Sequence, residues 1–559
     1  MSPAIKFFAL VLGTALSLLV LKWTNVLVFS GAQMTSILVF STFIYGTLLF
    51  GEFRLAFAFG GIAILLGLNL LTVGGFTEAA NLKVIIFLVG MFLVIGFLEE
   101  NQFFEQIVEW IVERVGPNPR MLLVVLMLMG TVAAALVDEV TSILFMTGTM
   151  LHLTGKYKLR PTPFIIMLVF ATNIGSAASS IGNPIGVMIA LNAGFSFTEF
   201  LRWSAPIAVV VNVATYFVCR WWYAEDFKAF ATAVQAEHDE LAAQGVKTPA
   251  HELEVDEETK KARRTCWIVF IMTISLLVTH SKTEHLIGSI LGVVRETTLV
   301  KTDGEGKVHE RHVHGLPSDA LADGRKIEKF NANLVNSPLQ NGWTIKSIEM
   351  GLGEGSLMIG AALLMGSIVL MLRREKAREL VERRVDWWTL TFFMMLFASV
   401  GTLEHTGVTS VIAQKLIATT GDNPFALINI VGWATGWLSA FLDNVLAVAT
   451  FMPVIHDVRV TWAAQNPNSP GYPEAIYWLM LFGGTFMGNM TVIGSTANII
   501  AVGILEKRGH GTVKFGEWFK IGFIVSIVSM AIAMVLLGVQ TKWFSQPLLR
   551  PPTSVIAEH

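Results

Sequence analysis

Two copies of one motif decide the fold: Ala133-Ala-Ala-Leu-Val-Asp138-Glu-Val-Thr141 and Leu438-Ser-Ala-Phe-Leu-Asp443-Asn-Val-Leu446. A Leu-Glu pair lies 39 residues before each Asp, at Glu99 and Glu404, so one offset of 305 residues relates all four acids. A carboxylate at membrane depth is costly and normally marks an ion or proton path. Its presence at equivalent places in two halves predicts a transporter built from repeats.

The composition is that of a polytopic membrane protein. Of 559 residues, 53% are hydrophobic and 15% are charged, whereas soluble domains carry about 25% charged residues. The net charge of −2 offers no basic surface for nucleic acid. The cysteines Cys219 and Cys266 fit neither a disulfide framework nor a thiolate metal site. The sequence has no Walker loop, zincin motif or nucleophile elbow, so we expect no enzyme, and any transport should be driven by an ion gradient.

Apolar runs of about 20 residues predict an all-helical fold of about eleven transmembrane helices. The expected spans lie near residues 5–22, 25–46, 54–73, 82–98, 164–191, 204–223, 265–281, 356–372, 387–403, 475–505 and 518–540. Two further apolar stretches, 120–153 and 424–456, are interrupted by the repeated Asp. Each is predicted to be a re-entrant hairpin, because irregular backbone is tolerated at depth only inside protein or along a cavity. Two full helices joined by a turn remain the alternative.

The positions of Lys and Arg predict the orientation, because short cytoplasmic loops are rich in both. The segment 373–384 holds six of them, and Lys156, Lys158 and Arg160 follow the first hairpin. The loop after the second hairpin, 457–474, has only Arg459. One hairpin should therefore enter from inside and the other from outside, which makes an inverted repeat with a cytoplasmic N-terminus.

This orientation divides the chain into predicted segments. The 282–355 insert is expected to be extracytoplasmic, small and strand-containing. The segments are N-terminal scaffold helices (1–80), a first repeat with an inward hairpin (81–223), a cytoplasmic connector (224–264), a transmembrane helix (265–281), the insert (282–355), a transmembrane helix (356–372), a basic cytoplasmic loop (373–386), a second repeat with an outward hairpin (387–541) and a C-terminal tail (542–559).

A second signature also occurs twice, as Ala171-Thr-Asn-Ile-Gly-Ser-Ala-Ala-Ser-Ser-Ile-Gly-Asn-Pro184 and Gly483-Gly-Thr-Phe-Met-Gly-Asn-Met-Thr-Val-Ile-Gly-Ser-Thr-Ala-Asn498. Glycine releases the backbone from helical geometry, and Pro184 cannot donate the next helical hydrogen bond. An unwound helix exposes carbonyls for a cation and a half-helix N-terminus for an anion. Close packing of small residues is the structural alternative.

These motifs define a candidate ion- or substrate-binding site. A carboxylate can coordinate a hard cation such as sodium or take up a proton, although an Asp can also simply cap a helix. Glu99 and Glu404 fall at the ends of spans and are equally explained by reaching the headgroups. We expect no catalytic residue, no cofactor and no metal other than sodium as a coupling ion. The site residues are Asp138, Glu139, Thr141, Ser142, Asn173, Gly182, Asn183, Asp443, Asn444, Asn489, Gly494, Ser495, Thr496 and Asn498.

At these residues the chain resembles the ion transporter superfamily of arsenite permeases, the P-protein, citrate permeases and, more distantly, divalent-anion:sodium symporters. The resemblance covers about 82–223 and 356–540 and includes Phe441-Leu-Asp-Asn-Val and the Gly488 to Gly503 segment. It implies eleven helices, two opposed hairpins, a homodimer and an elevator-like motion. The chain departs from the family's usual pattern at Glu139, where Asn is common, and at Asn183, where Asp is common.

The expected function is secondary active transport of a small ion coupled to protons or sodium in the inner or plasma membrane. Sodium/proton antiport and anion transport of the arsenite or citrate permease type both fit. The alternative is a membrane receptor or scaffold that displays the insert. The expected partners are a small inorganic or organic ion, the lipid bilayer and a second copy of the chain, but no nucleic acid.

Overall fold

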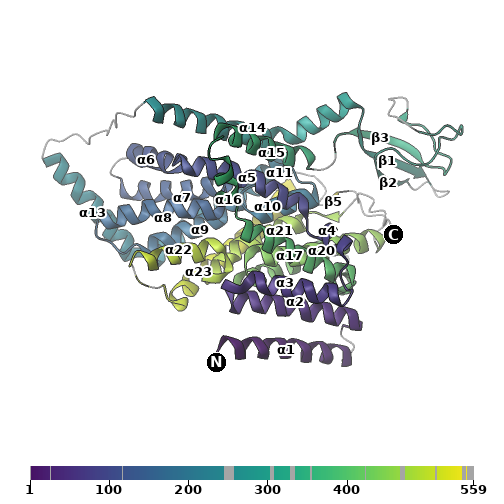
Figure 1. Cartoon of the computed structure of the whole chain (residues 1–559), viewed down its shortest axis with the longest axis horizontal. Helices are drawn as coiled ribbons and strands as arrows, with labels where there is room; N and C mark the ends of the chain where they lie inside the picture. The colour runs from purple at the N-terminus through teal and green to yellow at the C-terminus, as the bar shows by residue number, and fades with distance from the viewer. Residues whose placement is uncertain are drawn as a thin grey trace.

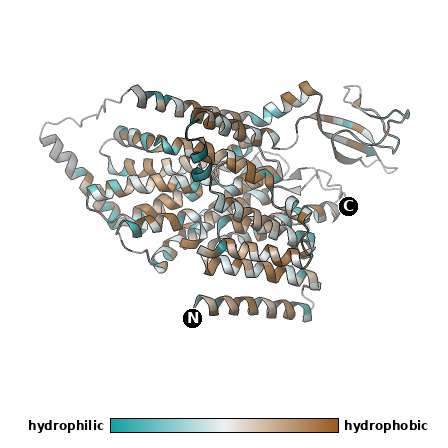
Figure 2. Cartoon of the chain, in the orientation of Figure 1, coloured by the Kyte–Doolittle hydropathy of each residue, from teal (hydrophilic) through white to brown (hydrophobic). Residues whose placement is uncertain are grey.

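The computed structural model describes residues 2–24, 27–115, 118–243, 257–302, 308–327, 334–352, 355–421, 423–465, 472–509, 511, 513–543 and 549–550. These residues form a bundle of long, roughly parallel helices with a small sheet at one end (Figure 1). Hydrophobic residues dominate the long helices (Figure 2).

Nine helices within the described part of the chain are long and apolar enough to cross a membrane. The number becomes ten if α10 (Pro184–Ala193) and α11 (Phe197–Trp203), bent by 110°, form one span. The prediction of an all-helical polytopic membrane protein is therefore confirmed, whereas the count of eleven and the inversion of the halves stay predictions.

The first three helices of the chain lie along one side of the bundle (Figure 1). Two of them differ from the expected spans for local reasons. The helix predicted at 25–46 begins at Gly31 because Ser30 and Gln33 form a capping box. The helix predicted at 54–73 ends at Gly67, shortly before Asn69 takes a left-handed φ of 55°. The elements are α1 (Pro3–Trp23), α2 (Gly31–Leu49), η1 (Gly51–Phe53), α3 (Arg54–Gly67), α4 (Val73–Ala79) and α5 (Leu82–Glu100).

The first half of the bundle contains a helix–break–helix and then a broken helix. The stretch predicted as a hairpin at 120–153 is α7 and α8, separated by Val137 and Asp138. The expected span 164–191 is interrupted between Ser176 and Pro184, where the Gly/Ser-rich motif is not helical. The elements are α6 (Phe103–Val115), α7 (Pro119–Leu136), α8 (Glu139–Lys156), α9 (Thr162–Ser176), α10, α11 and α12 (Ala205–Trp222).

The second half repeats this order. α19 (Pro424–Phe441) and α20 (Asn444–Gln465) are separated by Leu442 and Asp443, and two short 3₁₀ turns interrupt the expected span 475–505. The elements are α15 (Ser356–Leu372), α16 (Ala377–Arg384), α17 (Trp387–His405), α18 (Val408–Thr420), α19, α20, β4 (Tyr472–Pro473), α21 (Ala475–Phe486), η3 (Met487–Met490), η4 (Val492–Gly494), α22 (Thr496–Lys507), α23 (Phe515–Trp543) and β5 (Leu549–Arg550).

The insert begins with a helical part that the sequence analysis did not predict. α13 (Ala224–Ala243) begins the connector, and α14 (Glu257–Leu291) extends the helix expected at 265–281 in both directions. No proline or glycine interrupts that helix before Gly288, so it continues beyond its apolar part. The insert then forms an antiparallel sheet with strand order β2-β1-β3. Its strands are β1 (Val294–Thr302), β2 (Val308–His314) and β3 (Thr344–Met350). Parts of the predicted connector, insert and tail lie outside the described residues.

Candidate functional site

Asp138 and Asp443 are helix caps at the two breaks. The Asp138 Oδ1 atom accepts hydrogen bonds from the backbone N–H groups of Val140 (2.7 Å) and Thr141 (2.8 Å), at the start of α8. The Asp443 Oδ1 atom accepts one from the N–H of Val445 (3.0 Å) at the start of α20. Each carboxylate is half-buried and is stabilised by the helix N-terminus that it caps.

Glu139 is the deeply buried acid of the site, with a relative exposure of 4%. Its Oε1 atom accepts a hydrogen bond from Asn444 Nδ2 (2.8 Å) and another from Ser495 Oγ (3.3 Å), while Oε2 accepts from Ser176 Oγ (2.9 Å). All three donors are uncharged. Asn444 is also the residue that stands in the second copy where Glu139 stands in the first, so equivalent positions of the two copies contact each other.

Four buried amide and hydroxyl side chains connect the two broken helices. Asn173 Nδ2 donates to Asn489 Oδ1 (2.7 Å) and to Asn498 Oδ1 (2.8 Å), and Ser495 Oγ lies 3.1 Å from Asn173 Oδ1. Asn498 Nδ2 in turn donates to the carbonyl oxygens of Gly488 and Thr491. These hydrogen bonds satisfy polar backbone groups that the breaks leave without helical partners.

The last predicted polar residues lie at the edges of this network. Asn183 Nδ2 donates to Ser176 Oγ (2.8 Å), while its Oδ1 caps α10 by accepting from the N–H of Gly186 (2.7 Å). Thr496 Oγ1 donates to Asp443 Oδ2 (2.9 Å). The structure thus brings most of the predicted side chains into two groups, one around Glu139 and one around Asp443 with Thr496. The hydrogen bonds of Asp138 go to the start of α8 and not to either group.

Gly182 and Gly494 make corresponding close contacts in the two halves. A Cβ at Gly182 would lie 2.7 Å from the carbonyl oxygen of Ala134, and one at Gly494 would lie 3.0 Å from that of Ser439. Ala134 and Ser439 are themselves related by the 305-residue offset. Each Cβ would lie still closer to a carbonyl oxygen of its own broken segment, that of Ser176 or Gly488. Glycine is therefore required by tight packing within each segment and against α7 or α19.

Thr141 and Ser142 lie outside both groups. Thr141 contributes its backbone N–H to Asp138. Ser142 is fully buried, and its hydroxyl has no hydrogen-bond partner among the described residues; the same holds for Ser180. Ser176 was missed as a site residue, although it lies within the quoted Gly/Ser-rich motif between Asn173 and Asn183.

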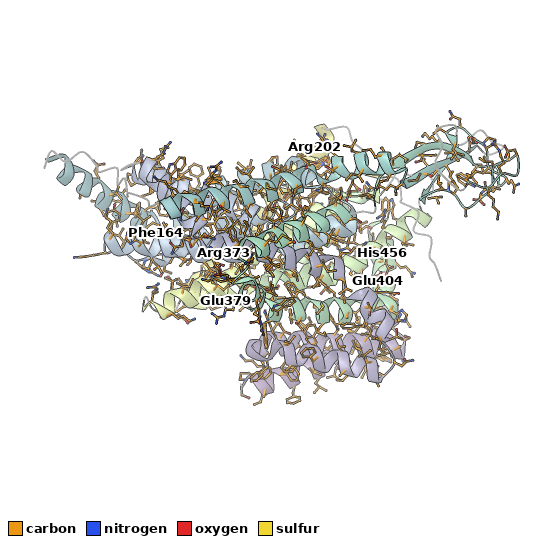
Figure 3. The ribbon with its side chains drawn as sticks, turned by 45° about the horizontal axis from the view of Figure 1, so that its top comes forward. Phe164, Arg202, Arg373, Glu379, Glu404 and His456 are labelled. Atoms are coloured by element: carbon orange, nitrogen blue, oxygen red, sulfur yellow. The ribbon has the colours of Figure 1, made fainter. Side chains whose placement is uncertain are left out.

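The repeated glutamates lie outside this network, and each contacts a basic side chain; the Glu404–His456 contact is an ion pair only when the imidazole is protonated. Glu99 Oε2 lies 3.1 Å from Arg384 Nη1, and Glu404 Oε1 lies 3.3 Å from His456 Nδ1. Figure 3 shows Glu404 and His456 together, away from Arg373 and Glu379.

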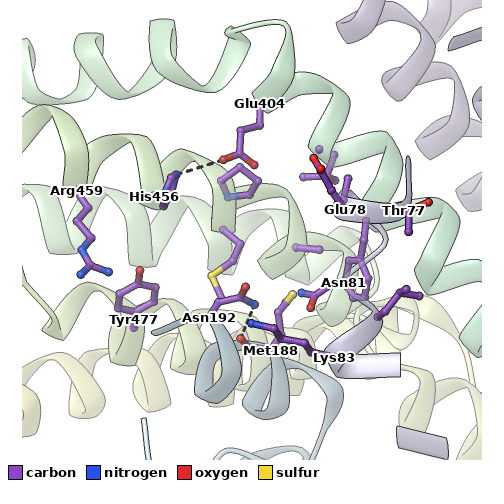
Figure 4. A pocket seen from close by; sticks show the side chains of 18 residues that line it. Thr77, Glu78, Asn81, Lys83, Met188, Asn192, Glu404, His456, Arg459 and Tyr477 are labelled. Carbon is purple, nitrogen blue, oxygen red and sulfur yellow. Dashed lines mark hydrogen bonds and ion pairs between the residues drawn. The ribbon is translucent and has the colours of Figure 1, made fainter. Parts of the chain in front are cut away.

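A cavity of about 500 Å³ is lined by both polar and apolar side chains, which Figure 4 shows. Met188 on α10 and Ala449 on α20 line it, and each lies five residues after a network residue, Asn183 and Asn444 respectively. Five helical residues rise about 7.5 Å, so the cavity is one to two helical turns from the network. The labelled polar lining residues are Thr77, Glu78, Asn81, Lys83, Asn192, Glu404, His456, Arg459 and Tyr477.

Comparisons with known proteins agree with a transporter. The family model described as "Citrate transporter" matches residues 45–483. An uncharacterized transporter of Mycobacterium tuberculosis is 24% identical over 458 residues, which cover 81% of this chain and 85% of that protein. The human P protein is 26% identical over 479 residues, and the matched region spans 82% of this chain but only 54% of the P protein. The YdaH transporter structure of Alcanivorax borkumensis is 15% identical, with a TM-score of 0.47 and coverage of 88% and 90% of the two chains.

Proposed function

Because this chain belongs to the citrate transporter family, we propose that it is a secondary transporter whose ion-binding site contains Glu139. It moves a small ion together with, or in exchange for, protons or sodium. Sodium/proton antiport and transport of a carboxylate or arsenite anion are the two forms to distinguish. The receptor alternative has no observation in its favour, whereas the matching family model and the Mycobacterium tuberculosis relative are described as transporters.

One observation carries the proposal: among the residues that the structure describes, the hydrogen-bond donors to the buried Glu139 carboxylate are the uncharged side chains of Asn444, Ser176 and Ser495. An ionised carboxylate in such surroundings costs several kcal/mol unless a cation accompanies it. The other two acids, Asp138 and Asp443, bring no positive charge to Glu139. Their own charges are already stabilised by the helix N-termini that they cap. A proton or a metal cation must therefore join Glu139 during part of the transport cycle.

The unpartnered Ser142 hydroxyl supports a bound ion in the same place. It lies on α8 one turn after Glu139, fully buried. Residues three apart on a helix share a face. Its oxygen, with the side-chain oxygens of Asn444 and Asn173, offers neutral ligands beside the carboxylate, and oxygen ligands are the ones that hard cations prefer.

The wider arrangement is part of the proposal. The two hairpins enter the membrane from opposite sides, the N-terminus is cytoplasmic, and the protein works in the inner or plasma membrane as a homodimer. Half-helix N-termini at α10 and α22 would face an anionic co-substrate.

Reconstitution into liposomes that contain a pH-sensitive dye tests this function. Sodium, citrate and arsenite are added separately to wild type, to Glu139→Gln and to Glu506→Gln, an exposed acid at the end of α22 that serves as the matched control. We expect ion-dependent proton movement in wild type and in the control, and none in Glu139→Gln. Proton movement with sodium alone selects antiport. Transport by Glu139→Gln at the wild-type rate would refute the site.

A further inference from the structure

The repeated glutamates Glu99 and Glu404 have partners of different chemistry. Glu99 pairs with Arg384, whose guanidinium stays charged at every physiological pH. Glu404 pairs with His456, and imidazole is the side chain that changes its charge near neutral pH. Of the two ion pairs, the one in the second half can therefore be made and broken by a proton.

The Glu404–His456 pair joins two helices across the wall of the cavity. Glu404 lies at the end of α17 and His456 in α20, twelve residues after Asn444. Twelve helical residues rise about 18 Å. The pair thus contacts the middle of α20, the helix whose first residue donates a hydrogen bond to Glu139.

The geometry suits an attraction that depends on charge. His456 Nδ1 is buried and lies 3.3 Å from Glu404 Oε1, but it makes no aligned hydrogen bond with any described residue. The rest of the ring is half-exposed to the cavity (Figure 4). A neutral imidazole gains little from this placement, whereas an imidazolium gains the attraction of the carboxylate.

Other charged groups do not replace Glu404 as the partner. Asp457 accepts hydrogen bonds from Thr409 Oγ1 (2.5 Å) and Ser410 Oγ (2.9 Å) on α18. The titratable and charged groups around His456 are Glu404 on α17, Asp457 and Arg459 on α20, Tyr477 on α21, and Glu78 and Lys83 on α4 and α5 across the cavity. α10 contributes the uncharged Asn192 and Met188.

We propose that Glu404 and His456 form a second proton-binding site, separate from Glu139, that holds α20 against α17 when it is protonated. Binding of one proton to the imidazole creates the ion pair and closes this side of the cavity. Loss of the proton releases α20 and admits solutes. The place of this step in a transport cycle rests on the proposed function, because α20 carries the residue that contacts Glu139.

Thiol accessibility at Met452 tests the proposal. Met452 lines the cavity on α20, and the native cysteines Cys219 and Cys266 are buried. Met452→Cys is introduced into the full chain with His456 intact, and also with His456→Gln, Glu404→Gln or His456→Arg. Each protein is labelled in detergent with a hydrophilic maleimide at about pH 5.5 and about pH 8.5. Rates are divided by the His456→Gln rate at the same pH, which removes the pH dependence of the reagent.

We expect the intact pair to label about two- to fivefold more slowly than His456→Gln at the acidic pH and equally at the alkaline pH, as for a half-exposed ion pair. Glu404→Gln should behave as His456→Gln does, and His456→Arg should label slowly at both pH values. Equal rates for the intact pair and His456→Gln at both pH values would overturn the proposal.

The same proteins separate this inference from the proposed function. If labelling depends on the pair but Glu139→Gln transports normally, the proton site stands and the function assigned to Glu139 is wrong. If Glu139→Gln abolishes transport while labelling ignores His456, the reverse holds.

Discussion

Asn444→Asp would place a second acid against Glu139 and make the two copies of the motif alike. The Asn444 Nδ2 atom lies 2.8 Å from Glu139 Oε1, and both side chains are buried, with exposures of 1% and 4%. Two carboxylates whose charges are about 4 Å apart repel by about 4 kcal/mol at an effective dielectric constant of about 20. That is roughly a thousandfold in a protonation equilibrium, since about 1.4 kcal/mol corresponds to a factor of ten.

The pair in Asn444→Asp should therefore keep one shared proton at neutral pH. A protonated Asp has the shape of Asn and donates the same hydrogen bond, so folding and neutral-pH transport should survive. Release of the shared proton at higher pH adds a second negative charge to the site. We expect a pH profile of transport that differs from wild type on its alkaline side.

Liposome flux measured between about pH 6 and about pH 9 provides the assay. Asn444→Ala is the matched control, because it removes the donor without adding an acid and leaves Glu139 short of one hydrogen bond, at a cost of about 1–3 kcal/mol. It should lower activity without a new alkaline limb. Identical pH profiles for Asn444→Asp and Asn444→Ala would refute the reasoning.

Three further substitutions test how the site is held. Asp138→Ala removes the two hydrogen bonds that cap α8, so it should lower stability by about 1 kcal/mol, measured by thermal unfolding in detergent. Asp138→Asn keeps the capping oxygen and should lose much less stability. Equal losses for the two variants would argue against a capping role. Gly182→Ala forces a Cβ to within 2.7 Å of the Ala134 carbonyl oxygen and should lower the free energy of unfolding by about 1–3 kcal/mol. Gly148→Ala, in α8 with no atom within 4 Å of the new Cβ, should raise it by up to about 1 kcal/mol. A Gly182→Ala protein more stable than Gly148→Ala would contradict the close approach. Ser176→Ala removes a donor to Glu139 and an acceptor for Asn183. The free energy of unfolding should fall by about 1–3 kcal/mol, and the transport rate should fall too. Wild-type stability and transport in this variant would exclude Ser176 from the network.

The positions of the breaks in the membrane helices were predictable from the sequence. An acid in an apolar stretch is rare enough to mark the breaks between α7 and α8 and between α19 and α20, and the Gly/Asn-rich segments predicted the interrupted helices. A further repeated signal was available but unused: Asn118-Pro119 and Asn423-Pro424, also 305 residues apart, cap and begin α7 and α19.

The different roles of Asp138, which caps α8, and Glu139, which contacts the second half of the chain, were not predicted. The physical basis of the difference is local. An N-cap side chain turns back to the first backbone N–H groups, so Asp138 is committed to α8. The next residue is free to point elsewhere, and here Glu139 reaches Asn444, Ser176 and Ser495. Which direction it takes depends on tertiary packing between segments more than 300 residues apart.

The partners of Glu99 and Glu404 were unpredictable for the same reason. Arg384 lies 285 residues from Glu99 in the chain, and His456 is in a different helix from Glu404. The ends of α14 were misplaced because apolar length measures the membrane-spanning part of a helix, while the helix itself continues until a residue such as Gly292, with φ of 69°, ends it.

Calorimetric titration of the purified full chain with sodium, citrate and arsenite, at one fixed pH, tests most directly whether Glu139 binds the transported ion. We expect wild type to bind at least one of them. If that ion is sodium, Glu139→Gln should bind it at least about tenfold more weakly, because loss of a charged partner costs about 1.5 kcal/mol or more. If it is an anion, Glu139→Gln should bind it more tightly, because the variant lacks the negative charge of Glu139. The Glu506→Gln control should match wild type. Equal dissociation constants for wild type and Glu139→Gln would contradict the account.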